Sequence, residues 1–71
     1  DGPGAARRAK AIVTNPTHIA IALEYDAQVE PAPKIITMGL DNTAEQIIKV
    51  ALDNNIPIMR NVDLAHTLYY R

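Results

Sequence analysis

The sequence predicts an α/β (α+β) domain in which a small mixed sheet of about four strands packs against helices. Short β-branched or apolar runs predict the strands, at 11–14, 17–24, 34–38 and 56–59. Two stretches with apolar residues at helical spacing predict the helices, at 44–52 and 64–69. The resulting order is β-β-β-α-β-α. A strand, a helix and a strand in succession imply a right-handed parallel crossover, so the sheet should be mixed.

The first two predicted strands flank a break. The run from Ala11 to Thr14 ends at Asn15-Pro16, because proline has no N–H for a strand ladder and favours a turn. From Thr17 onward side chains alternate between two faces. The face expected in the core carries Thr17, Ile19, Ile21 and Leu23, and the other carries His18, Ala20, Ala22 and Glu24. Alanines on the second face would let a helix or another backbone approach closely.

A polar connection with two prolines, 25–33, leads to the third strand, which Gly39 is expected to end. Asn42 or Thr43 should cap the first helix, with a glutamate or glutamine three residues later as a capping box. The pair Asn54-Asn55 should stop that helix.

The last two elements are a short buried strand and a helix. The run 56–59 tolerates Pro57 if the proline lies at a sheet edge or strand start. Asp63 is expected to cap the final helix, whose apolar stripe is Leu64, Ala65, Leu68 and Tyr69.

Composition limits the classes of function. The chain has 71 residues, a formal charge of −1, no cysteine and two histidines. We therefore expect one small domain with no disulfide framework, no metal site and no cofactor. The charge gives no drive toward nucleic acid, and no apolar run is long enough to span a membrane. Residues 1–10, with Gly, Pro, Arg7, Arg8 and Lys10, are typical of a linker. Their basic residues would suit either solvent or an anionic lipid surface.

The Asn15–Pro16 bond allows an unusual reaction. The ordinary asparagine succinimide forms by attack of the next backbone nitrogen, but Pro16 has no N–H for it. The Asn15 side-chain nitrogen can instead attack its own main-chain carbonyl carbon. A five-membered ring then closes and the proline leaves as a secondary amine, which cuts the chain. Such chemistry would be a single intramolecular turnover, not that of a conventional enzyme.

A fold could accelerate this slow reaction in three ways. A tight turn could hold the reacting atoms close together. Backbone N–H groups or a hydroxyl could stabilise the developing oxyanion, and a base could move the proton. Thr17 and His18 are chemically suited to the second and third tasks, provided that His18 folds back toward Asn15. The competing interpretation is an ordinary Asn-Pro turn in a non-cleaving interaction module.

The wider sequence resembles one family. The motif Asn-Pro-Thr-His lies between two predicted strands, the second of which reads IAIALEYD. Pro-x-Pro precedes the third strand, and a Leu-Ala-x-x-Leu-Tyr helix lies near the end. These features, from Ala11 to Arg71, are similar to the FlhB/YscU family, the export-switch proteins of type III secretion and flagellar systems. A nucleic-acid-binding domain is a distant alternative.

The resemblance implies a cytosolic domain at the inner face of the bacterial inner membrane, anchored by transmembrane helices outside this sequence. Residues 1–10 would be the linker from that membrane region, and 11–71 the autocleaving switch domain, truncated within its last helix. Cleavage between Asn15 and Pro16, supported by Thr17 and His18, would let the apparatus change its class of export substrate. The two pieces would stay associated.

The same resemblance implies partners among export apparatus proteins, secretion substrates or a needle-length regulator. One departure concerns the last helix, where Asp-Leu-Ala-His occupies 63–66 in place of the family's usual Pro-Leu-Ala-Arg. Any partner contact made by that arginine is therefore not expected here. Ile19 after the motif favours the injectisome branch over the flagellar one, and both stay open.

Overall fold

A computed structural model of the chain describes residues 2–16, 18–25, 28 and 32–71. Its four-stranded sheet has the order β3-β2-β1-β4. The strands are β1 (Ala11–Asn15), β2 (Ile19–Glu24), β3 (Lys34–Leu40) and β4 (Ile58–Arg60). β2 is antiparallel to both β1 and β3, whereas β4 is parallel to β1. The predicted mixed sheet is confirmed, and α1 (Asp41–Asp53) carries the chain from one sheet edge to the other.

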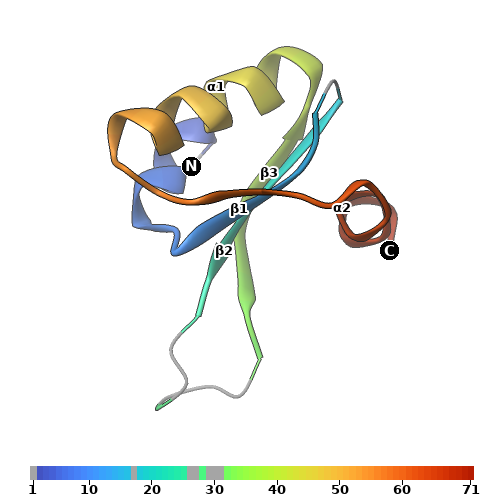
Figure 1. Ribbon diagram of the computed structural model, residues 1–71, viewed down its shortest axis with the longest axis horizontal. Coiled ribbons are helices and arrows are strands. Elements are labelled where there is room, and N and C mark those ends of the chain that lie inside the picture. Colours follow the sequence, from blue (N-terminus) through green and yellow to red (C-terminus); the bar gives the residue numbers. More distant parts are fainter. Residues whose placement is uncertain (1, 17, 26–27, 29–31) are drawn as a thin grey trace.

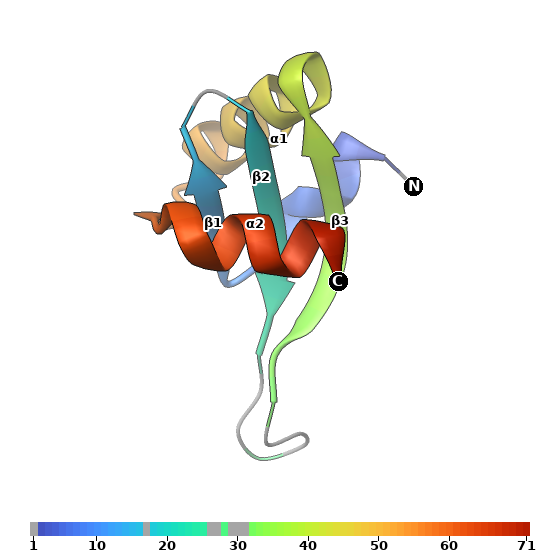
Figure 2. The ribbon, with the colours of Figure 1, turned by 90° about the vertical axis from the view of Figure 1, so that its right-hand side faces the viewer.

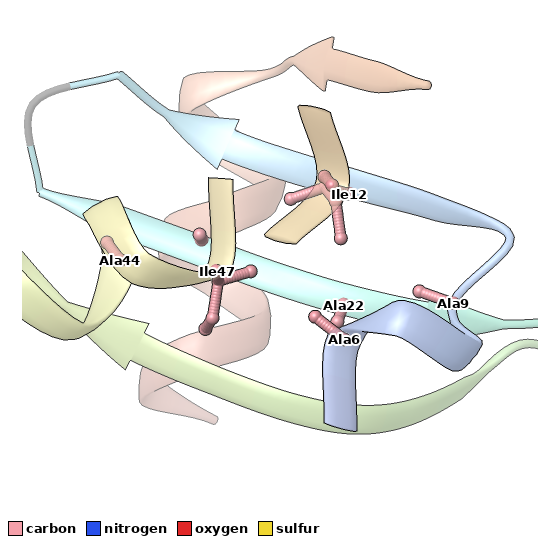
Figure 3. Packing of buried hydrophobic residues seen from close by; sticks show 8 residues of the cluster. Ala6, Ala9, Ile12, Ala22, Ala44 and Ile47 are labelled. Carbon is pink, nitrogen blue, oxygen red and sulfur yellow. The ribbon is translucent and has the colours of Figure 1, made fainter. Parts of the chain in front are cut away.

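Helices cover both faces of this sheet. α1 and a short 3-10 helix, η1 (Pro3–Arg8), lie on one face, and α2 (Val62–Tyr70) crosses the other (Figures 1 and 2). The core is accordingly divided into two clusters by the sheet. On the α1 face the buried residues are Ala6, Ala9, Ile12, Ala20, Ala22, Ala44, Ile47 and Ala51 (Figure 3). On the α2 face they are Val13, Ile19, Ile21 and Ala65.

The alternation predicted for β2 is confirmed from Ile19 to Ala22, whereas His18, predicted on the alanine face, lies in the turn before the strand. Ile19 and Ile21 face α2, while Ala20 and Ala22 face α1 and η1. All four side chains are buried, and the two alanines leave room for α1 and η1 to approach the backbone closely on their face. Thr17, which was predicted on the isoleucine face, lies outside the described residues.

The predicted end of β3 and start of α1 are both wrong. β3 continues past Gly39 because Leu40 pairs with Ile19 of β2. The chain then enters α1 without a loop, through Asp41 in the left-handed region with φ 50°. Asn42 and Thr43 therefore lie inside the helix, and Leu40 is its N-cap. α1 ends where predicted, with Asn54 as its C-cap.

The later elements are shifted by one or two residues, and the strand predicted to be buried is exposed, because β4 (Ile58–Arg60) lies at the edge of the sheet. The Ile56 N–H still donates to the Ala51 carbonyl at 2.9 Å, so the parallel pairing with β1 begins only at Ile58. The cap predicted at Asp63 is also wrong. The Asn61 side chain accepts a hydrogen bond from the Leu64 N–H at 3.1 Å and caps α2. Asp63 lies within the first turn, where a carboxylate favours the helix N-terminus.

The N-terminal residues contribute to the folded domain. The composition predicted a linker, but η1 packs beneath α1, and Ala6 is fully buried with Ala9 nearly so. Arg7 and Arg8 of η1 are exposed. In the described part of the chain, no helix has the length and apolar character needed to cross a membrane.

Candidate functional site

The Asn-Pro motif forms the turn of the β1–β2 hairpin. Asn15 is the last residue of β1 and pairs with Ile19, the first residue of β2. Pro16 and His18 lie between them and are exposed, whereas Asn15 is half-buried. Thr17 lies outside the described residues, so the structure does not describe its hydroxyl. The predicted site residues Asn15, Pro16 and His18 are thus brought together at the tip of one hairpin.

One backbone hydrogen bond spans the turn. The His18 N–H donates to the Asn15 carbonyl oxygen at 3.0 Å. This oxygen belongs to the carbonyl that Asn15 cyclisation would attack. A donor about 2.7–3.1 Å from such an oxygen is suited to stabilise the negative charge that develops there. The turn therefore places one backbone hydrogen-bond donor on the Asn15 carbonyl oxygen.

The Asn15 side chain lies on the α2 side of the sheet. Val13, two residues earlier in β1, packs in the α2-facing cluster, and strand alternation gives Asn15 the same face. Among the described residues, none hydrogen-bonds the Asn15 side chain. Within the described ranges, the Asn15 amide is therefore not engaged by another side chain or backbone group.

The His18 imidazole contacts the start of α1. Its Nδ1 lies 3.3 Å from Oδ1 of Asp41, and both side chains are largely exposed. The Asp41 N–H also donates to the His18 carbonyl oxygen at 2.8 Å. No described contact joins the His18 ring to Asn15. The group of His18 that reaches the Asn15 peptide is its backbone N–H, and a role of the ring as a base stays a prediction.

The main chain before the Asn15–Pro16 bond is held from both sides. β1 is an interior strand, paired with β2 on one side and β4 on the other. Two hydrogen bonds flank the pairing of β1 with β4. The Asn61 N–H donates to the Thr14 carbonyl at 3.0 Å, and the Ile12 N–H donates to the Pro57 carbonyl at 2.9 Å. Thr14 is only 4% exposed. The Asn15 carbonyl therefore lies at the end of a strand that is hydrogen-bonded on both sides.

Asp41 is the residue of this site that the sequence analysis missed. Its proximity to His18 depends on the long-range pairing of Leu40 with Ile19, which no local pattern indicates. An acidic residue between the predicted strand and the predicted helix cap was the only local signal. Within the described ranges, no group of three or more histidine, cysteine, aspartate or glutamate residues could hold a metal ion.

Similar proteins are named as components of flagellar and secretion systems. The chain is 40% identical over 62 residues to the flagellar biosynthetic protein FlhB of Aquifex aeolicus (strain VF5), covering 87% of this chain and 18% of that protein. It is 39% identical over 64 residues to the secretion system apparatus protein SsaU of Salmonella typhimurium, covering 90% of this chain and 18% of SsaU. The chain thus spans about a fifth of the length of these curated relatives.

Solved structures confirm the fold. The cytoplasmic domain of FlhB from Shewanella putrefaciens superposes with a TM-score of 0.86 at 35% identity, covering 96% of this chain and 52% of that one. A mutated EscU C-terminal domain gives a TM-score of 0.85 at 40% identity, covering 94% and 67% of the two chains. The family model described as "FlhB HrpN YscU SpaS Family" matches residues 4–71. The chain therefore belongs to the FlhB, HrpN, YscU and SpaS family.

Proposed function

We propose that this domain cuts its own chain between Asn15 and Pro16. The Asn15 side-chain nitrogen attacks the Asn15 carbonyl carbon, a C–N bond forms, and the bond to the Pro16 nitrogen breaks. The attacking nitrogen loses a proton and the Pro16 nitrogen gains one. The products are residues 1–15 ending in a succinimide and residues 16–71 beginning with a proline amine.

The observation that carries this proposal is the 3.0 Å hydrogen bond from the His18 N–H to the Asn15 carbonyl oxygen. Removing one oxyanion donor from an enzyme typically costs about 10²–10³ in rate, so a fixed donor here is a substantial contribution. The absence of an N–H on Pro16 directs cyclisation toward cleavage. Support also comes from EscU C-terminal domain structures, solved with replacements at an asparagine and at the proline one position later.

The central experiment follows freshly purified chain by intact mass at neutral pH. We expect fragments of residues 1–15 and 16–71 to accumulate. Asn15→Ala should stay whole. The matched control, Asn55→Gly, changes an asparagine with φ 56° at the far end of α1 and should cut at the parent rate. A parent chain that stays whole after prolonged incubation would overturn the proposal and favour the non-cleaving interaction module.

A second variant tests the direction of ring closure. Pro16→Ala supplies a backbone N–H, which reopens the ordinary succinimide route and leaves the chain intact. This variant should therefore give less cleavage and more isoaspartate at position 15, measured by peptide mapping. Equal cleavage with no isoaspartate would contradict the assigned nucleophile.

The two fragments should remain bound to each other. Residues 1–15 contribute an interior strand and fully buried side chains at Ala6 and Ile12. Native mass spectrometry should detect both pieces in one particle, and denaturant should separate them. Separate particles under native conditions would contradict the expected association of the two fragments.

We place this cleavage in a wider role as a switch of export substrate class at the cytoplasmic face of the inner membrane. The names of the flagellar and secretion-system relatives support the assignment to an export apparatus. Residues 1–10 would connect to membrane helices, and the partners would be export proteins, secretion substrates or a needle-length regulator. In the full-length protein, Asn15→Ala should alter the ratio of early to late substrates exported. An unchanged ratio of early to late substrates would mean that cleavage does not cause the switch in export substrate class.

A further inference from the structure

His18 is held at three points. Its N–H donates to the Asn15 carbonyl at 3.0 Å, and its own carbonyl accepts from the Asp41 N–H at 2.8 Å. Its ring Nδ1 lies 3.3 Å from the Asp41 carboxylate. Two of these three contacts thus come from Asp41, 23 residues away along the chain.

These contacts form a continuous path to the bond that would be cut. The Asp41 N–H donates to the His18 carbonyl oxygen, and the His18 N–H in turn donates to the Asn15 carbonyl oxygen. With the proton on Nδ1, the imidazole donates to the carboxylate, which limits rotation of the side chain and of the turn that carries it. A donor that stays in place needs no reorganisation as negative charge develops on the oxygen.

We propose that Asp41 is a positioning residue for cleavage, and this inference rests on the proposed function. Its carboxylate orients His18, and the His18 N–H then stays directed at the Asn15 carbonyl. Asp41 acts through His18 and does not touch the reacting atoms.

The backbone of Asp41 makes a clean test possible. Its φ of 50° lies in the left-handed region, which glycine adopts freely and asparagine tolerates well. Asp41→Gly therefore removes the carboxylate while retaining the backbone N–H and the turn into α1. Asp41→Asn retains a side-chain oxygen that accepts a hydrogen bond and removes only the charge.

The experiment compares first-order cleavage rates by intact mass for the parent, Asp41→Gly, Asp41→Asn, His18→Ala and the double variant His18→Ala/Asp41→Gly. Exposed contacts of this kind are worth a modest factor, so Asp41→Gly should cleave roughly two- to fivefold more slowly. Asp41→Asn should recover most of the parent rate. In the His18→Ala background, Asp41→Gly should cause no further slowing, because the ring through which the carboxylate acts is gone. Urea unfolding of each variant, made in an Asn15→Ala background, shows whether a slower cleavage rate reflects a lower free energy of unfolding.

The outcomes divide clearly. A parent that cleaves and an Asp41→Gly variant that cleaves equally fast would overturn the inference and leave the proposed function intact. Equal slowing by Asp41→Gly with and without the His18 ring would also overturn it, since the carboxylate would then act by another path. A parent that does not cleave overturns both claims.

Discussion

Ile12 gives the sharpest test of how the N-terminal segment is held. Its side chain is fully buried, and it packs on the α1 side of the sheet against small residues and Ile47. Replacement by alanine leaves a space that the neighbouring backbones of β1 and β2 cannot close, because both are fixed by ladder hydrogen bonds. We expect Ile12→Ala to lower the free energy of unfolding by about 3–4 kcal/mol, within the usual range for buried isoleucine.

That loss is large for a domain of this size. At about 0.05–0.15 kcal/mol per residue, the whole chain has roughly 4–10 kcal/mol of stability. Ile12→Ala should therefore bring the protein close to half-unfolded in mild denaturant. Ile12→Val should cost only about 0.5–1.5 kcal/mol.

The assay is urea unfolding monitored by circular dichroism, performed in an Asn15→Ala background so that the chain stays continuous. Ile35 supplies the matched control, since it is 42% exposed on the edge strand β3. Ile35→Ala should cost about 0.5 kcal/mol or less. Equal losses for Ile12→Ala and Ile35→Ala would refute the argument that the N-terminal strand carries a major part of the core.

Three further changes test the surroundings of the turn by the same unfolding measurement. Gly39→Ala should lose about 1–3 kcal/mol, because the new Cβ would overlap Thr43 Cγ2 and lie 2.7 Å from Thr43 Cβ; a neutral result would show that α1 can shift freely. Asn61→Ala should lose about 1 kcal/mol with the cap on the Leu64 N–H, and Asn61→Asp should retain it. Ala65→Leu should lose about 1–3 kcal/mol by overpacking the fully buried contact of α2 with the sheet, and any gain in stability would contradict that close approach.

The faces of the hairpin could be predicted because strand alternation is a local property. From Ile19 to Leu23 every second residue is large and the intervening residues are alanines, so a helix had to approach the alanine side closely. The position of Asn15 and Pro16 at the turn followed from proline's missing N–H. Each of these features depends only on neighbours in sequence.

The features that escaped prediction depend on contacts between distant residues. Asp41 reaches His18 only because Leu40 pairs with Ile19, and a register of this kind has no local signature. η1 escaped because its sequence is rich in glycine, alanine and arginine, which is typical of linkers. Its buried Ala6 gains a place in the core from the small side chains of β2 beneath it.

The position of the Asn-Pro turn in the sheet determines what a cut there would do to the domain. β1 is an interior strand, so a break after Asn15 leaves its hydrogen bonds to β2 and β4 in place and removes only the covalent link of the hairpin. β4 has three residues, all exposed, at the sheet edge, and a break beside it would leave far less to hold that strand. Cleavage at the hairpin would instead release the turn from the end of β1. The released segment includes His18, which contacts Asp41. The proposed reaction would therefore change the exposed surface at the start of α1 while the packed sheet stays assembled.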